Sequence, residues 1–398
     1  MATASLSKNV LMNSVIGVVG GGQLAQMLVE AAKGRNVEVI VQAESHSDPA
    51  AKKANSLILA ETQDAFGTSQ LINACSSVTF ENEWVNIEEL AKLETEKGCF
   101  IPSLAAIDPL INKISQRQLL DALEIPGPEW MQLSSEKLGF SKLPSGWNFP
   151  LMAKSGKGGY DGKGTKVINS FDDLNELLQS VDSKDWLIEE WVPYEKELAL
   201  VASRDLEGRI RAFPLSQTHQ FNQVCDWVLA PAEVSHSVQA LAYNMVASLL
   251  TKLNYVGVIA IEFFYGPKGL LVNEVAPRTH NSAHFSIEAC NSSQFDQQVC
   301  IAADIPVPDP ELIVPGAIMV NLLGLPVEKA PPLNDRLAEL KRINGAHLHW
   351  YQKNKEIPGR KLGHVTLLLY SDNAQARREE ALRGLESIRS IWPLNLTS

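Results

Sequence analysis

The first hundred residues alternate short apolar runs with amphipathic stretches, a pattern typical of strands that alternate with helices. We expect an amphipathic helix over residues 24–32, and strands over residues 15–19, 37–41, 57–60 and 77–80. Such alternation predicts an α/β arrangement in which helices cover a parallel sheet. Turn signals at Ile101-Pro102-Ser103 and Asp108-Pro109 then place a domain boundary near residue 110.

The middle of the chain has a different pattern, because its short strands lie around a glycine-dense loop. We expect helices over residues 111–123, 171–180 and 235–253, and strands over residues 151–154, 165–168 and 186–191. Runs of strands flanked by helices predict an α+β module. Two further apolar strands, 256–264 and 269–275, are joined by Tyr265-Gly266-Pro267-Lys268, which predicts a hairpin.

A proline-rich stretch over residues 305–310 marks a second boundary. Beyond it we expect strands at 317–322, 347–351 and 364–369 and a terminal helix from about Asn373. The hydrophobic pattern therefore predicts a multidomain α/β and α+β protein. Its predicted domains are a parallel-sheet domain (1–110), a central domain with a glycine-rich lid (111–310) and a small β-rich C-terminal domain (311–398).

Composition and charge narrow the kinds of partner. The 398 residues are 45% hydrophobic and 20% charged, which is typical of a soluble globular protein. With 35 basic and 46 acidic residues, the net charge of −11 gives no general attraction to nucleic acid or to anionic membranes. No apolar run approaches the ~20 residues of a spanning helix. We expect small-molecule substrates, and neither a nucleic acid nor a membrane as partner.

The five cysteines form no CxxC pair and have no histidine at metal-ligand spacing. A disulfide framework or a zinc site is therefore not expected, and a reducing compartment, the cytoplasm, fits best. The residues up to about Asn13 carry only Lys8 and lack the features of a signal peptide, so we interpret them as a short extension.

The segment from Gly20 to Ala25 has the spacing G-x-G-x-x-A between a predicted strand and a predicted helix. Backbone N–H groups and the helix dipole can meet a phosphate at such a turn. Glu44 lies near the distance at which an acid binds a ribose. A dinucleotide site and a simple tight turn both remain open here.

A loop from Lys154 to Gly164 combines many glycines with Lys154, Lys157 and Lys163. Glycine allows the backbone to approach a ligand closely, and lysine supplies positive charge. The loop lacks the spacing of a Walker motif. We favour a flap over nucleotide phosphates; the alternative is a solvated hairpin tip.

Two carboxylates, Glu262 and Glu274, interrupt the apolar strands of the predicted hairpin. With the turn at Pro267 and Lys268 they are nearly opposite and on one face. Two carboxylates with Asn273 and nucleotide phosphates are a usual magnesium site. The alternative is a structural ion pair with an Arg or Lys.

Other polar groups remain ambiguous from their positions alone. The loop after Glu274 carries Arg278, His280, Asn281 and Ser282, which are expected either to line a substrate site or to form a surface turn. Three acids lie near Trp191: Glu189, Glu190 and Glu197. They are expected either to contact a nucleotide base and ribose or to form a charged sheet edge. Cations Lys353, Arg360 and Lys361 are as easily solvated as functional. No G-x-S-x-G elbow is present, and no Cys or Ser is identifiable as a nucleophile with an adjacent histidine.

Taken in order, four segments resemble the ATP-grasp superfamily and, within it, the 5-(carboxyamino)imidazole ribonucleotide synthetases. They are residues 20–28 (GGGQLAQML), 158–164 (GGYDGKG), 273–282 (NEVAPRTHNS) and 358–364 (PGRKLGH). The resemblance spans nearly the whole chain and decides against a nicotinamide site. It implies a pre-ATP-grasp domain, an ATP-grasp core and a C-terminal domain, and suggests a homodimer.

The activity that the resemblance implies is carboxylation of the amine of 5-aminoimidazole ribonucleotide with ATP and bicarbonate, through carboxyphosphate. It implies that ATP and Mg²⁺ are the cofactors, with Glu262 and Glu274 on the metal. Nucleotide contacts would come from Lys113, Lys154, Gly159, Tyr160, Asp161, Gly162, Lys163, Gly164, Thr165, Glu189, Glu190, Trp191, Val192, Glu197, His219, Asn273 and Glu274.

Substrate contacts and catalytic groups follow from the same resemblance. The substrate contacts would be Gly22, Gln23, Leu24, Arg278, His280, Asn281, Ser282, Lys353, Arg360 and Lys361. The catalytic residues would be Tyr160, Asp161, Arg278, His280 and Asn281. The chain departs from its relatives at Lys113, where they often have Arg, and at Gln220, where they have His. A slip of one residue would bring His219 to that contact, and an amide at Gln220 is the alternative.

Three other functions are compatible with parts of this pattern. Another ATP-grasp carboxylate–amine ligase, such as a formate-dependent glycinamide ribonucleotide transformylase, would use formate in place of bicarbonate. A nucleotide-binding regulator without turnover would explain the departures at Lys113 and Gln220. A nicotinamide oxidoreductase would use the first glycine motif.

Overall fold

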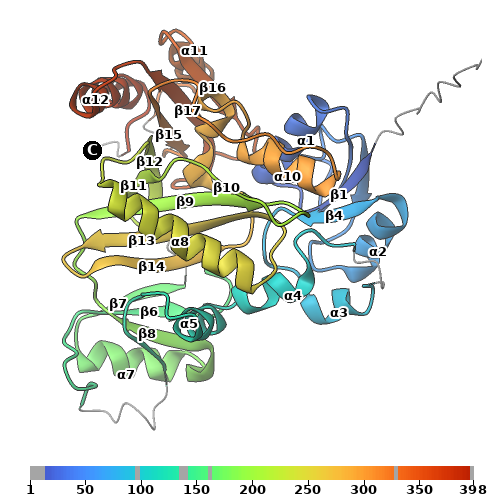
Figure 1. Cartoon of the computed structure of the whole chain (residues 1–398). Helices are drawn as coiled ribbons and strands as arrows, with labels where there is room; N and C mark the ends of the chain where they lie inside the picture. The colour runs from blue at the N-terminus through green and yellow to red at the C-terminus, as the bar shows by residue number, and fades with distance from the viewer. Residues whose placement is uncertain (1–13, 95–98, 134–141, 160–163, 327–329, 395–398) are drawn as a thin grey trace, which may run out of the picture.

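The N-terminal part folds as its hydrophobic pattern predicts. The computed structural model describes residues 14–94, 99–133, 142–159, 164–326 and 330–394. Among these residues the first sheet has four parallel strands in the order β3-β2-β1-β4 (Figure 1). Its elements are β1 (Val15–Val19), α1 (Gln23–Lys33), β2 (Glu38–Ala43), β3 (Ser56–Leu59), α2 (Ala65–Ala74), β4 (Ser77–Phe80) and α3 (Ile87–Ala91). The predicted parallel sheet is confirmed.

A helical connection leads from this sheet to the rest of the molecule. It contains α4 (Leu104–Ile107), η1 (Asp108–Leu110) and α5 (Lys113–Ala122). The Asn112 side chain caps α5 by accepting the backbone N–H of Ile114 (2.8 Å). The buried face of α5 includes Gln116 and Arg117 as well as apolar residues. Burial of such groups is costly unless they are hydrogen-bonded, so this face of α5 must meet polar partners.

A small antiparallel sheet follows, with its four described strands in the order β5-β8-β6-β7. The strands are β5 (Trp130–Gln132), β6 (Leu151–Ser155), β7 (Thr165–Ile168) and β8 (Trp186–Glu190). Helix α7 (Phe171–Ser180), which precedes η2 (Ser183–Asp185), packs Leu174 and Leu177 into the same core as Leu151 and Ile188. The small sheet therefore has its own apolar core.

The third described sheet is the largest. Its described strands number nine, in the order β14-β13-β9-β11-β12-β15-β17-β16, with β10 beside β9. Its strands before residue 310 are β9 (Lys196–Arg204), β10 (Ile210–Ala212), β11 (Ser216–Phe221), β12 (Val224–Ala230), β13 (Gly257–Gly266) and β14 (Gly269–Ala276). Helix α8 (His236–Lys252) packs on it through Ala242, Val246 and Leu249. The predicted hairpin is confirmed as β13 and β14, with Gly266 opposite Gly269.

The C-terminal strands do not form a sheet of their own. They are β15 (Gly316–Leu323), β16 (Ala346–Trp350) and β17 (Lys361–Leu369), and β15 pairs antiparallel with β12. The sheet thus continues from the central into the C-terminal part of the chain. The remaining helices are η3 (Asn281–Ala283), α9 (Ser286–Ala289), α10 (Gln294–Ala302), α11 (Leu333–Leu340) and α12 (Ala374–Ile391).

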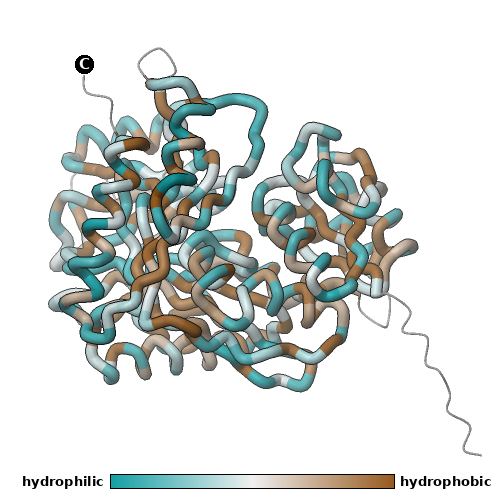
Figure 2. Tube along the Cα trace, turned by 90° about the horizontal axis from the view of Figure 1, so that it is seen from above, coloured by the Kyte–Doolittle hydropathy of each residue, from teal (hydrophilic) through white to brown (hydrophobic). Residues whose placement is uncertain are grey.

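Apolar segments lie inside both the N-terminal lobe, at the right of Figure 2, and the larger body beside it. One core joins the lobe to the large sheet, because Val78 and Phe80 belong to the same cluster as Ile107 and Ile259. Helices α1 and α10 share a second core through Leu28 and Val299. In the described parts of the chain, no helix has both the length and the apolar character needed to cross a membrane.

Candidate active site

The two expected metal carboxylates face each other on the hairpin. Glu262 of β13 is the register partner of Glu274 on β14, and the register shifts directly after Glu262. Such a bulge changes the direction in which the following side chains point. The described residues contain no cluster of three or more His, Cys, Asp or Glu side chains suited to a metal ion. Two carboxylates completed by phosphate oxygens nevertheless suit magnesium, which is usually held by few protein ligands.

The two carboxylates differ in their affinity for protons. Burial, with the neighbouring Glu274, raises the pKa of Glu262 to about 7. Burial also opposes ionisation of Glu274, but Lys113, with help from Lys154, outweighs burial and leaves the pKa of Glu274 below its usual value. Lys113, the first residue of α5, forms an ion pair with Glu274. One carboxyl of the pair is therefore short of positive charge, which is the environment that a divalent cation would complete.

A buried cluster lies beside this pair. Lys154 on β6 donates to Glu189 Oε2 (2.7 Å) and to Asn273 Oδ1 (2.9 Å). Glu189 accepts a second charged donor, Arg117 Nε, at its other oxygen (2.7 Å). Attraction from Lys154 and Arg117 outweighs burial and lowers the pKa of Glu189. Both carboxyl oxygens of Glu189 are thus bonded to Arg117 and Lys154 and do not face open space.

The segment after Glu189 links the small sheet to strand β9 of the large sheet. Lys268 donates to Glu190 Oε2 (2.6 Å), while the Trp191 side chain is exposed and Val192 is buried. Burial raises the pKa of Glu197, whose carboxyl is hydrogen-bonded to the side chains of Tyr194 and Gln220. The segment thus offers a flat apolar surface at the exposed Trp191 ring, and the start of β9 offers a carboxyl, Glu197, that is hydrogen-bonded to an amide.

His219 and Gln220 have different surroundings. His219 Nδ1 lies 3.0 Å from Asp226 Oδ2, and its ring stacks on Trp227 with centroids 5.2 Å apart. The Gln220 side chain instead contacts Glu197. The register of β11 with β12 shifts between these two residues, so strict alternation does not apply here. The Gln220 amide is the one hydrogen-bonded to Glu197, while His219 acts on the same carboxyl electrostatically.

The loop after β14 is held from several directions. Arg278 Nε donates to Glu83 Oε2 (2.6 Å), which brings the β4 loop of the N-terminal lobe to the site. Asn281 and Asn321 exchange amide hydrogen bonds of 3.0 and 2.7 Å. These contacts fix the loop between the lobe and strand β15.

His280 in this loop is neutral. Burial, with Arg278 and Lys361, lowers the pKa of His280 well below its usual value. The backbone N–H of Ser282 donates to His280 Nδ1 (3.4 Å), so the ring proton is on Nε2, which lies 3.6 Å from Glu262 Oε1. The imidazole therefore points an N–H at a carboxyl whose pKa is raised.

The glycine turn before α1 reaches the same region. The backbone N–H groups of Gly22 and Leu24 donate to Glu81 (2.6 and 3.1 Å). Gly20 adopts φ +112°, and a Cβ on Gly22 would lie 2.2 Å from Glu81 Oε1, so the turn requires glycine at these two positions. The donors that a phosphate would use are thus taken by a carboxylate, and the turn is linked to the predicted substrate region through Glu81, on which Arg278 acts electrostatically.

The C-terminal strand β17 brings a cation, Lys361, to the carboxylate pair. Lys361 acts electrostatically on both Glu262 and His280, lowering the pKa of each. Lys353 Nζ donates to the Lys361 carbonyl oxygen (2.7 Å) and lies 5.6 Å above the Tyr351 ring. Arg360 is exposed at the turn that Gly359 forms with φ +77°.

The tip of the predicted flap, with Tyr160, Asp161, Gly162 and Lys163, lies outside the described residues. Its two ends are described. Ser155 N donates to the Gly164 carbonyl oxygen (2.7 Å), and the Thr165 hydroxyl donates to Gln223 (2.7 Å). Gly159 lies next to Gly164, whose φ is +74°. The loop therefore leaves and re-enters the small sheet beside Lys154.

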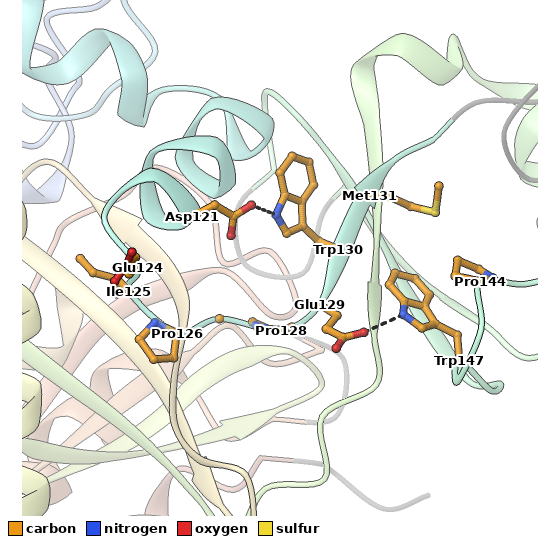
Figure 3. A pocket seen from close by; sticks show the side chains of 11 residues that line it. Asp121, Glu124, Ile125, Pro126, Pro128, Glu129, Trp130, Met131, Pro144 and Trp147 are labelled. Atoms are coloured by element: carbon orange, nitrogen blue, oxygen red, sulfur yellow. Dashed lines mark hydrogen bonds between the residues drawn. The ribbon is translucent and has the colours of Figure 1, made fainter.

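A separate cavity of about 690 Å³ lies at the other end of α5 (Figure 3). Trp130 Nε1 donates to Asp121 (2.8 Å) and Trp147 Nε1 to Glu129 (3.0 Å) in its wall. None of the site residues predicted from the sequence lines it. The described cavity is therefore distinct from the site around Glu262, Glu274 and Lys154.

Several residues of the site were not predicted from the sequence. They are Glu81, Glu83, Arg117 and Asn321, and each joins segments that are distant in the chain. Only Arg117 carried a signal, because it lies four positions after Lys113 and so on the same face of α5.

Two sheets that enclose lysines and a carboxylate pair define the ATP-grasp class. An ATP-grasp domain model matches residues 118–295. It is flanked by a match to the ribonucleotide synthetase preATP-grasp domain over residues 12–108 and to the phosphoribosylaminoimidazole carboxylase C-terminal domain over residues 317–379.

Relatives narrow the class to one family. The chain is 43% identical over 378 residues to the N5-carboxyaminoimidazole ribonucleotide synthase of Synechococcus elongatus, covering 95% of each chain. It is similar to two structures of the Aspergillus clavatus enzyme, each 28% identical and covering 95% of this chain and 99% of the other. The complex with ATP has a TM-score of 0.84, and the complex with ADP and 5-aminoimidazole ribonucleotide 0.81. The chain therefore belongs to the N5-carboxyaminoimidazole ribonucleotide synthase family.

Proposed function

We propose that the chain carboxylates the amine of 5-aminoimidazole ribonucleotide with ATP and bicarbonate, in purine biosynthesis. The observation that supports this most is that two groups of residues, one from the ATP-grasp sheets and one from the C-terminal strands, act at one site. Glu262, Glu274 and Lys154 suit a nucleotide and its metal, while Lys361 acts on Glu262 from the C-terminal hairpin. A site with Lys154 from one group and Lys361 from the other suits two phosphorylated substrates.

The chemistry needs no protein nucleophile. A bicarbonate oxygen attacks the γ-phosphorus of ATP, the bond to ADP breaks, and carboxyphosphate forms. The amine nitrogen of the ribonucleotide then bonds to the carboxyl carbon, directly or after CO₂ is released, as phosphate departs and the nitrogen loses a proton. Both steps need neutralisation of phosphoryl charge and exclusion of water.

The residues present fit magnesium, because Glu262 faces Glu274 and its raised pKa reports a shortage of positive charge. Glu262 and Glu274 would hold the ion, which when bound neutralises phosphoryl charge. Lys113 and Lys154 bind phosphate oxygens, and the flap of Gly159–Thr165 excludes water, with Tyr160 and Asp161 toward bicarbonate. The segment 189–192 and Glu197 bind adenine and ribose. The contact that relatives make with a histidine is assigned to Gln220 rather than to His219.

The ribonucleotide lies between the 278–282 loop and the C-terminal hairpin. Arg278 and Asn281 bind around the reacting amine and bicarbonate, and His280, held by Ser282, donates its Nε2 proton toward them. Lys353, Arg360 and Lys361 bind the 5′-phosphate, and the turn at residues 22–24 borders the same substrate. We also propose a cytoplasmic homodimer, with domains over residues 1–110, 111–310 and 311–398.

The direct test is ADP release by the full chain with ATP, bicarbonate and 5-aminoimidazole ribonucleotide, each omitted in turn. We expect rapid release only with all three present. Release that depends on formate and glycinamide ribonucleotide would instead identify the other carboxylate–amine ligase. ATP binding without turnover under any of these conditions would identify a regulator.

A further inference from the structure

Arg117 joins the two sheets that form the nucleotide end of the cleft. Its side chain is only 4% exposed. Nε donates to Glu189 Oε1 on the small sheet (2.7 Å), while Nη1 and Nη2 donate to the consecutive carbonyl oxygens of Val272 and Asn273 on the large sheet (2.7 and 2.8 Å). A single guanidinium thus bridges two structural units that share no strand pairing.

These contacts close into a ring. Lys154 bonds to Glu189 Oε2 (2.7 Å) and to Asn273 Oδ1 (2.9 Å), and Arg117 bonds to the other oxygen of Glu189 and to the backbone of Asn273. With two cations and one carboxylate, the ring carries one net positive charge. Buried charges persist only when they are paired and hydrogen-bonded, which explains why every oxygen of Glu189 is used.

Only arginine can make this connection. Three donors must point at once toward a carboxylate and two carbonyls, and the planar guanidinium holds them in a fixed fork. Gly127 keeps the space for the fork open, since a Cβ there would lie 2.8 Å from Nη1. A lysine at residue 117 would keep the charge but could not satisfy all three acceptors.

We propose that Arg117 is a positioning residue that fixes Lys154 relative to Asn273 and Glu274. Lys154 belongs to the small sheet and the two others to β14, so their relative placement depends on a tie between the sheets. The proposal rests on the proposed function, in which Lys154 and Glu274 act on the same nucleotide. Such placement matters because small displacements of charged groups cost phosphoryl transfer heavily.

The chain contains a matched control. Arg336 on α11 is 2% exposed and also uses three donors: Nη1 and Nη2 to Glu356 (2.9 and 2.8 Å) and Nε to the Pro331 carbonyl (2.9 Å). It lies in the C-terminal part of the chain, in contact with Trp392. Arg336→Lys therefore disturbs a buried arginine–glutamate pair of similar form whose partners, Glu356 and Pro331, differ from those of Arg117. Because Glu356 precedes Arg360 in the C-terminal connection, only the nucleotide parameters of this variant serve as the control.

The experiment compares Arg117→Lys with Arg336→Lys in the full chain. Melting temperature, kcat, the KM of each substrate and ADP affinity by calorimetry are measured. Both variants are expected to lower the melting temperature. Only Arg117→Lys should weaken ADP binding and raise the KM for ATP, by roughly 10- to 100-fold, with the ribonucleotide KM within about threefold of wild type.

Two results would overturn the proposal. One is a loss of melting temperature in Arg117→Lys with nucleotide parameters within about threefold of wild type; the other is an equal nucleotide effect in Arg336→Lys. If Arg117→Lys does not fold, Gly127→Ala keeps every charge but crowds Nη1, and it should raise the KM for ATP in the same direction. ADP calorimetry needs no ribonucleotide. A wild-type chain without bicarbonate-dependent turnover would therefore refute the proposed function separately.

Discussion

The two phosphate sites of the proposed function differ in how their cations are held. At the nucleotide end, Lys154 and Arg117 are buried and tied to Glu189. At the proposed ribonucleotide end, Arg360 is exposed on a turn, and Lys353 lies over the ring of Tyr351. This support under Lys353 is uncharged, because Tyr351 bonds to His364 (2.7 Å), whose pKa burial holds well below its usual value.

The difference follows from what each phosphate does. The γ-phosphoryl of ATP reacts, so its ligands must be placed in advance and shielded from water. The 5′-phosphate of the proposed substrate does not react, so we expect exposed cations on a firm base to be sufficient for binding it. Changes at the nucleotide end should therefore lower turnover, and changes at the other end should mainly raise a KM.

The largest effect is expected for Glu274→Gln, which keeps the shape of the side chain but removes one charge from the metal pair and from Lys113. Turnover should fall on the order of 10²- to 10³-fold. ADP release measured against magnesium concentration tests this, with circular dichroism and melting as controls for folding. Near-normal turnover at limiting magnesium would contradict the metal assignment.

Arg360→Ala tests the opposite end of the cleft. Hydrogen bonds to charged groups contribute about 1.5–3 kcal/mol, so the KM for the ribonucleotide should rise roughly 10- to 150-fold while that for ATP barely changes. Lys355→Ala, which removes an exposed cation from the same connection, is the matched control and should change neither KM. A selective rise in the KM for ATP would show that the proposed assignment of the hairpin to the ribonucleotide is wrong.

The pKa of Glu262 predicts a pH-dependent effect on stability without magnesium. The folded-state pKa of about 7 lies above the ordinary value of 4.5, so the folded state binds the proton more tightly. This stabilising contribution is fully present below pH 4.5 and is lost as the pH rises through 7. Glu262→Gln mimics the protonated form and should unfold like wild type at pH 4 but be more stable at pH 8, by about 1–3 kcal/mol.

Denaturant unfolding at the two pH values measures this difference. A constant difference between the two proteins would mean that Glu262 keeps its ordinary pKa. It would also remove the physical reason for placing a cation beside it.

The smallest effect is expected for Tyr351→Phe, which removes the hydroxyl bonded to His364 beneath the hairpin. One neutral hydrogen bond contributes about 0.5–1.5 kcal/mol, so the ribonucleotide KM should rise by roughly 2- to 10-fold and the ATP parameters should stay constant. Tyr370→Phe, at a side chain 67% exposed, is the control. An unchanged ribonucleotide KM would show that the uncharged base does not support the phosphate contact.

Sequence reasoning predicted those parts of the site that are encoded locally. Glu262 and Glu274 interrupt two apolar runs on either side of one short turn, so their pairing follows from strand geometry. The first parallel sheet follows equally from alternating patterns.

Other parts could not be predicted because they depend on how distant segments meet. Arg117 bonds to Glu189, which is 72 residues away in the sequence, and Leu24 bonds to Glu81, which is 57 residues away. The continuation of the large sheet from β12 into β15 was also not predicted, since the sequence of an antiparallel strand does not identify the distant strand with which it pairs.

The transfer of a bicarbonate oxygen to phosphate tests the proposed reaction most directly. Bicarbonate labelled with ¹⁸O would be supplied with ATP and 5-aminoimidazole ribonucleotide, and the released phosphate examined by mass spectrometry. Because a bicarbonate oxygen attacks the γ-phosphorus, each phosphate should carry one ¹⁸O, corrected for exchange with water. Phosphate that forms in step with carboxylated product but contains no ¹⁸O would contradict the carboxyphosphate mechanism.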